Sequence, residues 1–173
     1  HNIFVPQTIP EALREYEEAG TLEKLYENGI LSGYRVETHG ENGELDSVQI
    51  FDTAGNSIRN ELYNSDGTLL GYVLYEYDVT GYCKRVDQYD NTGMIYSAYE
   101  LDSDGNEVKR EIYTDGRLTQ TWITEYDDAG NMVQSEVYIG GTLRYVNEYD
   151  QAGNLIRIES YDDNGDLFGY GLY

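Results

Sequence analysis

The sequence predicts a mainly β protein: an antiparallel meander of about 12 strands made of tandem hairpins, single-layered or curled, with a short N-terminal helix. Three observations support this prediction. A phrase of an aromatic residue, Asp, two small or polar residues and Gly recurs about every 12 residues, a period typical of repeat proteins. Glycines mark the turns, and Tyr, Val, Ile and Thr fill the segments between them, as strand propensity favours. Strict copies of the phrase lie at 77–81, 89–93, 126–130, 149–153 and 161–165.

The first 20 residues lie outside the repeats. Thr8 near the cap, Pro10 in the first turn and Gly20 as a stop signal predict a helix over 12–19. We expect this helix to cap the first edge strand or to pack on the aliphatic face of the sheet. The alternative is that 16–20 form one more repeat turn. The apolar stripe of the predicted helix would consist of Ile9, Leu13 and Tyr16. The domain boundaries follow: an N-terminal segment at 1–20 and a repeat domain at 21–173.

The repeat strands begin after this segment. The first hairpin is expected to comprise 22–26 and 30–38 around a turn at 27–29. Later strands follow one another through turn glycines, because Gly supplies the positive φ that a tight hairpin needs. Both prolines, Pro6 and Pro10, precede the repeats, so no repeat strand loses a backbone hydrogen-bond donor.

Counting from each turn glycine divides the side chains of a strand into two sets. Even offsets hold an apolar residue at position two and an aromatic residue at position eight, which predicts a Tyr–Leu pair in each hairpin. Between them, alternate strands carry a base and an acid, as in Arg59 and Glu61 or Lys109 and Glu111. The true repeat is therefore a two-strand hairpin. Odd offsets are aliphatic and predict a face that a helix, curling of the sheet or a partner must cover.

The phrase Glu-Tyr-Asp-x-x-Gly-Asn at 125–131 and 148–154 resembles the YD repeat of bacterial RHS and WapA-type surface proteins. The shorter Tyr-x-x-Gly units at 26–29 and 113–116 are similar to those of MORN-like and YwqK-like repeats. The resemblance covers roughly 26–173 and concerns the repeat alone. In larger RHS proteins such repeats build a β shell around a toxic domain, and carbohydrate binding has been proposed for them. The resemblance implies a strand-and-turn unit in a bacterial surface or secreted protein.

Composition narrows the possible partners and the setting. With 33 acidic and 11 basic residues the net charge is −22, so nucleic acid and anionic membrane surfaces are poor partners. No apolar stretch is long enough to insert in a membrane. Cys83 is the single cysteine, so no intrachain disulfide can form, and no cofactor motif is present. The sequence begins without Met, which suggests a processed product whose signal peptide has been removed.

Two groups of residues could bind a ligand. Tyr99, Trp122 and Tyr145 lie at central even offsets of alternate strands and are predicted to form stacking platforms for sugar rings; the alternative is that they pack on Arg and Lys stems as cation–π contacts. Oxygen-bearing side chains alternate in the turn at 102–106 and at Asp162, Asn164 and Asp166, as in calcium loops, although hairpin turns favour the same residues.

No catalytic constellation is apparent. The two histidines, His1 and His39, offer little for a catalytic triad, and the carboxylate pairs recur with the repeat. We therefore expect a non-catalytic bacterial module, extracellular or on the cell surface, that binds glycan or protein. One alternative is a structural spacer that pairs through its sheet edge, as an edge-to-edge homodimer, or through its aliphatic face, since 168–173 carries no charge. Another is a YwqK-like antitoxin or immunity protein.

Overall fold

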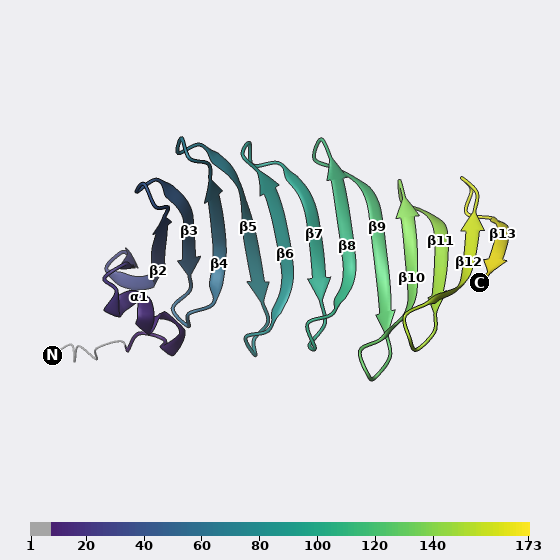
Figure 1. The fold of residues 1–173 in the computed structure, drawn as a ribbon, viewed down its shortest axis with the longest axis horizontal. Helices are drawn as coiled ribbons and strands as arrows, with labels where there is room; N and C mark the ends of the chain where they lie inside the picture. Colours follow the sequence, from purple (N-terminus) through teal and green to yellow (C-terminus); the bar gives the residue numbers. More distant parts are fainter. Residues whose placement is uncertain (1–7) are drawn as a thin grey trace. The chain divides into compact units, whose positions relative to one another are not determined.

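The computed structural model describes residues 8–173 and confirms a mainly β fold with a short N-terminal helix (Figure 1). All described strand pairs are antiparallel, and the order of the 13 strands in the sheet follows the chain. The elements are η1 (Glu11–Leu13), α1 (Arg14–Glu18), β1 (Leu22–Glu27), β2 (Ile30–His39), β3 (Leu45–Phe51), β4 (Ser57–Tyr63), β5 (Leu69–Tyr77), β6 (Cys83–Asp90), β7 (Ile95–Leu101), β8 (Glu107–Thr114), β9 (Arg117–Tyr126), β10 (Met132–Ile139), β11 (Thr142–Tyr149), β12 (Leu155–Tyr161) and β13 (Leu167–Leu172).

The chain forms two compact units, the first ending at Leu74 and the second beginning at Tyr75. The first unit contains the helix and the strands up to most of β5. The second contains the end of β5 and the strands from β6 to β13, which lie side by side in chain order (Figure 1). No helix within residues 8–173 is long and apolar enough to cross a membrane.

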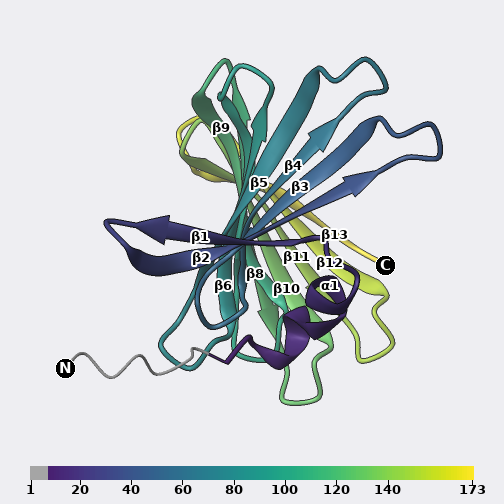
Figure 2. The ribbon, with the colours of Figure 1, turned by 90° about the vertical axis from the view of Figure 1, so that its left-hand side faces the viewer.

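The helical segment made of η1 and α1, drawn in purple in Figure 2, contributes to the core of the first unit. Leu13 is 1% exposed and packs with Tyr34, Val36 and Phe51 from β2 and β3. Tyr16 also joins this cluster, with its ring centroid 6.4 Å from that of Phe51. The predicted helix is therefore confirmed as a cover for the sheet, and the alternative of an extra repeat turn is wrong.

The Asp of the repeat phrase holds the turns together. The Asp127 carboxylate accepts hydrogen bonds from the backbone N–H groups of Ala129 at 2.9 Å and Asn131 at 2.8 Å. Gly130 adopts φ 81°, a left-handed conformation that favours glycine. Hydrogen bonds from backbone N–H groups to Oδ1 recur in eight turns, which begin at Asp52, Asn64, Asp78, Asp90, Asp102, Asp127, Asp150 and Asp162.

Each described hairpin also contains a β-bulge at a constant position. Between β8 and β9, Tyr113 pairs with Leu118 and Ile112 with Gln120, so Thr119 has no directly opposite residue. The strand-end pairing of an aromatic with an aliphatic residue is confirmed in Tyr63–Leu69, Tyr89–Ile95, Tyr113–Leu118, Tyr138–Leu143, Tyr149–Leu155 and Tyr161–Leu167.

These bulges overturn the predicted division into a polar even face and an aliphatic odd face. One extra residue in a strand exchanges the faces of the side chains beyond it. Tyr99, at an even offset, therefore lies opposite Arg110, at an odd one, and Lys109 lies opposite Glu100. Aliphatic residues are consequently divided between the two faces, and the single aliphatic face expected from the sequence is not formed.

The base–acid pairs of alternate strands gather on one face of the second unit, which we call the charged face. Its charged residues include Arg85, Asp87, Glu100, Lys109, Glu111, Glu136, Glu148, Arg157 and Glu159. Lys109 Nζ lies 2.9 Å from a Glu111 oxygen and 3.3 Å from a Glu100 oxygen. The Tyr113 hydroxyl donates to Glu111 at 3.0 Å. Burial raises the pKa of Glu111, but hydrogen bonds from Lys109 and Tyr113 outweigh it, so the pKa lies below its usual value.

Candidate ligand-binding surface

Tyr99, Trp122 and Tyr145 share the other face of the second unit and lie in a single row across the strands. Successive residues of this row are directly opposite one another in neighbouring strands, so their side chains point to the same side. We call this set the aromatic row. From β6 to β13 it consists of Val86, Tyr99, Arg110, Trp122, Val137, Tyr145, Ser160 and Gly169.

Trp122 and Tyr145 are the open rings of the row. Their exposed fractions are 44% and 42%. They stand on β9 and β11, so their backbones are roughly 9.5 Å apart, twice the spacing of neighbouring strands. Polar groups flank them on the same face: the Asn147 amide donates to Ser135 Oγ at 3.1 Å. An exposed pair of rings beside amide and hydroxyl groups is a surface suited to stacking with additional hydrogen bonds.

Tyr99 has a different environment from the other two predicted residues. Its ring is half-buried, and the Arg110 guanidinium lies 5.8 Å from its centroid. Glu107 fixes that guanidinium through hydrogen bonds of 2.8 and 2.5 Å. Burial raises the pKa of Tyr99, while Arg110 acts in the opposite direction. The predicted alternative of a cation–π contact therefore applies to Tyr99, which supports Arg110 and is not an open platform.

A hollow of about 430 Å³ adjoins Tyr145. Ser160 from β12 and Phe168 from β13 line it, and an ion pair between Arg144 and Asp163 lies at its border. Phe168, the extra residue of the last bulge, is 85% exposed. Phe168 lies three residues after the turn glycine Gly165, an odd offset, so a count that ignores the bulge assigns it to the aliphatic face. Its aromatic character on the second strand after Tyr145 was the signal that could have identified it.

The proposed calcium residues form a hairpin turn. Asp162 Oδ1 accepts the backbone N–H of Asn164 at 2.8 Å and that of Asp166 at 3.0 Å. These hydrogen bonds hold the pKa of Asp162 below its usual value. In residues 8–173, no group of three or more His, Cys, Asp or Glu side chains is placed to hold a metal ion. The turn at 102–106 has the same Asp geometry.

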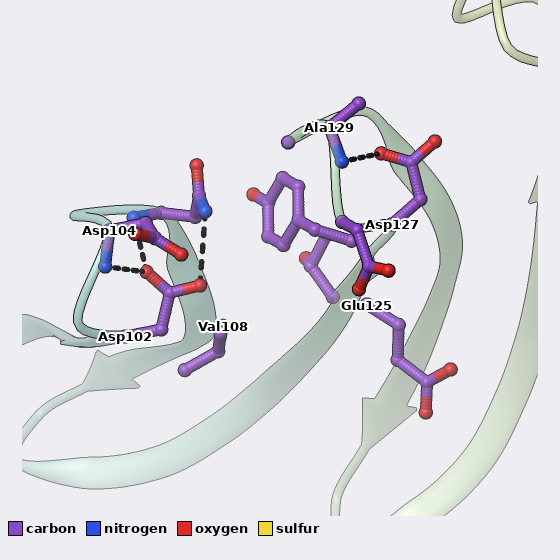
Figure 3. Close-up of a pocket in the computed structure, with 11 residues that line it drawn as sticks. Asp102, Asp104, Val108, Glu125, Asp127 and Ala129 are labelled. Carbon is purple, nitrogen blue, oxygen red and sulfur yellow. Dashed lines mark hydrogen bonds between the residues drawn. The ribbon is translucent and has the colours of Figure 1, made fainter.

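A second hollow, of about 730 Å³, lies between the β7–β8 and β9–β10 turns (Figure 3). Acidic residues dominate its lining: Asp102, Asp104, Glu125, Asp127 and Asp128. The carboxylates of Asp102 and Asp127 are turned onto the backbone N–H groups of their own turns (Figure 3). Two of the five acids therefore serve the turns.

The single thiol is poorly suited to nucleophilic chemistry. Burial raises the pKa of the Cys83 thiol, which keeps it protonated at neutral pH, and its sulfur lies 3.6 Å from the Arg85 carbonyl oxygen.

The fold and its surfaces together define a class of protein, an antiparallel repeat sheet whose second unit has a charged face and an exposed aromatic row.

Comparison with known proteins adds little to this class. No family model and no curated protein matches the sequence. Among solved structures, a chain of the TcdB2-TccC3-Cdc42 complex is 12% identical over 88% of this chain, with a TM-score of 0.30. A chain from the structure of accessory secretory proteins 1, 2 and 3 in Streptococcus pneumoniae is 13% identical over 92% of this chain, also with a TM-score of 0.30.

The protein spans only 13% and 22% of the lengths of those two chains. A TcdB2-TccC3-TEV chain gives a similar result, with 11% identity and a TM-score of 0.31 over 88% of this chain and 12% of that one. At this level of identity and TM-score, the matches do not define the type of repeat. They carry no argument about function, so the resemblance to YD repeats continues to rest on the sequence phrase.

Proposed function

We propose that this protein is a non-catalytic interaction module of a bacterial surface or secreted protein, and that it binds neutral glycan on the aromatic row. The single observation that supports this proposal most strongly is the exposure of Trp122 and Tyr145 on alternate strands of one face. Exposed apolar rings that lie together on one face are typical of binding surfaces, so their arrangement in a row favours a binding role.

The chemistry around the rings favours sugars. The apolar side of a sugar ring stacks on an aromatic face, and its hydroxyl groups need donors and acceptors at the edge. Asn147 and Ser135 provide both kinds of group next to Tyr145. The net charge of −22 repels acidic ligands, so a neutral glycan is the best match.

The test is glycan-array binding of the parent chain and of Trp122→Ala and Tyr145→Ala. Loss of one stacking contact should weaken binding about tenfold, because an aromatic contact contributes about 0.5–1.5 kcal/mol beyond burial. Ile123→Ala is a matched control, since Ile123 adjoins Trp122 and faces the charged side. Reduced binding with an unchanged melting temperature supports the proposal. Destabilisation without a specific loss of binding contradicts it.

A second candidate function is assembly through the β13 edge. β13 is the last strand in the sheet order and contains no charged residue, whereas β1, at the other end of the order, carries Glu23, Lys24 and Glu27. Charged side chains protect edge strands from pairing, and β13 lacks this protection. Tyr170 and Leu172 are 68% and 72% exposed there.

The proposed occupant of this edge is a second copy of the chain, paired β13 to β13. Such an isologous contact closes as a dimer, while pairing with the charged β1 would be penalised. Analytical ultracentrifugation should show a concentration-dependent dimer that high salt strengthens by screening the acidic chains. Leu172→Lys should abolish it, and Leu70→Lys, at an exposed site in the first unit, should not. A monomer at all concentrations would exclude this function.

A further inference from the structure

A third exposed ring, that of Phe168, lies next to Gly169, the last position of the aromatic row. Trp122, Tyr145 and Phe168 lie on β9, β11 and β13, two strands apart each time. Two strand spacings are roughly 9.5 Å, which is close to the length of a disaccharide unit in an extended polysaccharide. From this spacing we propose that the three rings are successive stacking subsites for one extended, neutral polysaccharide chain that runs across the strands.

This inference rests on the proposed glycan-binding function and specifies its ligand. The rows of directly opposed residues run perpendicular to the strands, so a ligand lying on Trp122 and Tyr145 continues towards β13. Phe168 meets it there, because this ring lines the same hollow as Tyr145 and Ser160. The third subsite therefore continues the line of the first two.

The floor between Tyr145 and Phe168 is nearly free of side chains. After Tyr145 the row continues with Ser160 and then Gly169. A Cβ atom added at Gly169 would meet no atom within 4 Å, and its backbone does not have a positive φ. Glycine here is not required by conformation or by crowding. A bare strand leaves the space that a sugar ring needs next to the backbone.

The arrangement distinguishes an extended ligand from a compact one. Three rings on alternate strands favour a straight chain whose alternate sugar units present the same face. A curved or helical polysaccharide that stacks on one ring would turn away from the surface and would not reach the second or third ring. The Arg110 guanidinium, bound by Glu107, adds no free charge beside Trp122, so the row offers no attraction for uronic acids.

The test is isothermal titration calorimetry with neutral β-1,4-linked oligosaccharides of glucose and of N-acetylglucosamine, from dimers to hexamers. We expect the hexamer of one series to bind at least about tenfold more tightly than its dimer, since each further ring contact adds affinity. Phe168→Ala should weaken hexamer binding about fivefold and change dimer binding far less. Maltohexaose, which curves, and an acidic galacturonate hexamer should bind weakly.

Two further variants separate a ligand contact from a structural role. Tyr170→Ala removes an exposed ring from the opposite face of β13 and should leave binding unchanged. Gly169→Val should improve strand propensity, so folding is retained, while its side chain fills the floor and weakens hexamer binding.

Equal affinity for dimer and hexamer, or a Phe168→Ala variant that binds the hexamer normally, would overturn the extended-chain ligand while leaving glycan binding intact. The same conclusion holds if neither oligosaccharide series binds but another neutral glycan on an array does. Absence of binding to every neutral glycan would contradict the proposed function itself, and this inference with it.

Discussion

Replacing Leu13 with alanine is expected to destabilise the first unit strongly. Leu13 is 1% exposed and contributes the central contact of the helical segment to Tyr34, Val36 and Phe51. Helix α1 has only five residues, a length that is not stable by itself, so its position depends on this contact. Loss of the leucine side chain therefore affects the helix and the strands beneath it together.

The magnitude follows from the burial of the side chain. Truncation to alanine removes three carbon atoms, and at about 0.8 kcal/mol each this lowers the free energy of unfolding by about 2.4 kcal/mol. The cavity left among Tyr34, Val36 and Phe51 adds to this loss, and measured Leu→Ala changes in cores range over about 2–5 kcal/mol. We expect about 3 kcal/mol. Leu70→Ala, at a site that is 57% exposed, should cost less than about 1 kcal/mol.

Urea unfolding followed by far-UV circular dichroism gives the free energies, and hydrogen exchange locates the effect. The single tryptophan, Trp122, lies in the second unit, so its fluorescence is not a direct probe of this core. Exchange in β1, β2 and β3 should rise in Leu13→Ala and stay near the parent level in Leu70→Ala. A loss below about 1 kcal/mol in Leu13→Ala would show that the helix does not close the core.

Three further predictions concern the charged face and the turns. On acidification, the Glu111→Gln variant should lose less stability than the parent. The pKa of Glu111 in the folded protein lies below its unfolded value of about 4.3. The stabilisation from the ionised Glu111 is therefore present above that pH and disappears as the pH falls through the folded pKa. Denaturant curves of both chains at several acidic pH values test this, and parallel losses would contradict it. Asp127→Ala should lower the free energy of unfolding by removing the acceptor of two backbone N–H groups, whereas Asp127→Asn, which keeps an acceptor oxygen, should lower it less in the same assay. Millimolar calcium should leave the melting temperature unchanged, because Asp162 already accepts two backbone N–H groups; a clear rise would support the calcium hypothesis.

Local features of the fold could be predicted because each is encoded in a few neighbouring residues. The Asp127 carboxylate accepts the N–H groups of the residues two and four positions later, and the glycine between them is left-handed. The repeat phrase contains the Asp and the Gly that this turn requires. The helix was indicated by Pro10, Gly20 and an apolar stripe. Its burial of Leu13 follows from that stripe.

The assignment of faces could not be predicted from offsets, because it depends on how many residues lie between two paired positions. A single bulge per hairpin places Lys109 opposite Glu100, and Arg157 opposite Glu148. The sequence contained a signal for the bulges in these opposite charges. A register without bulges places each base opposite an aromatic or polar residue, whereas a shift by one residue places it opposite an acid, which is more favourable.

Each bulge exchanges the faces of the side chains once, so two successive bulges restore the original face on alternate strands. This explains why part of the candidate site was predicted correctly. Tyr99, Trp122 and Tyr145 all stand on odd-numbered strands, so an argument from even offsets places them on one face despite the error between neighbours. Phe168 occupies the bulge itself, where the alternation of side chains is interrupted. Counting along the chain therefore assigned it to the wrong face.

Because each bulge exchanges the faces, equivalent offsets on the two strands of a repeat point to opposite faces of the sheet. Central even offsets carry Lys109 and Glu111 on β8, where they form the charged network, and carry Trp122 on β9, where it is exposed on the opposite face. Equivalent positions in the repeat thus have different surroundings according to the strand. A scan of these positions should separate into two groups: charged-face variants such as Glu111→Gln that change stability and its pH dependence, and row variants such as Trp122→Ala that change binding with little effect on unfolding. If both groups altered only stability, the aromatic row would be a structural element, and the glycan proposal would fail with it.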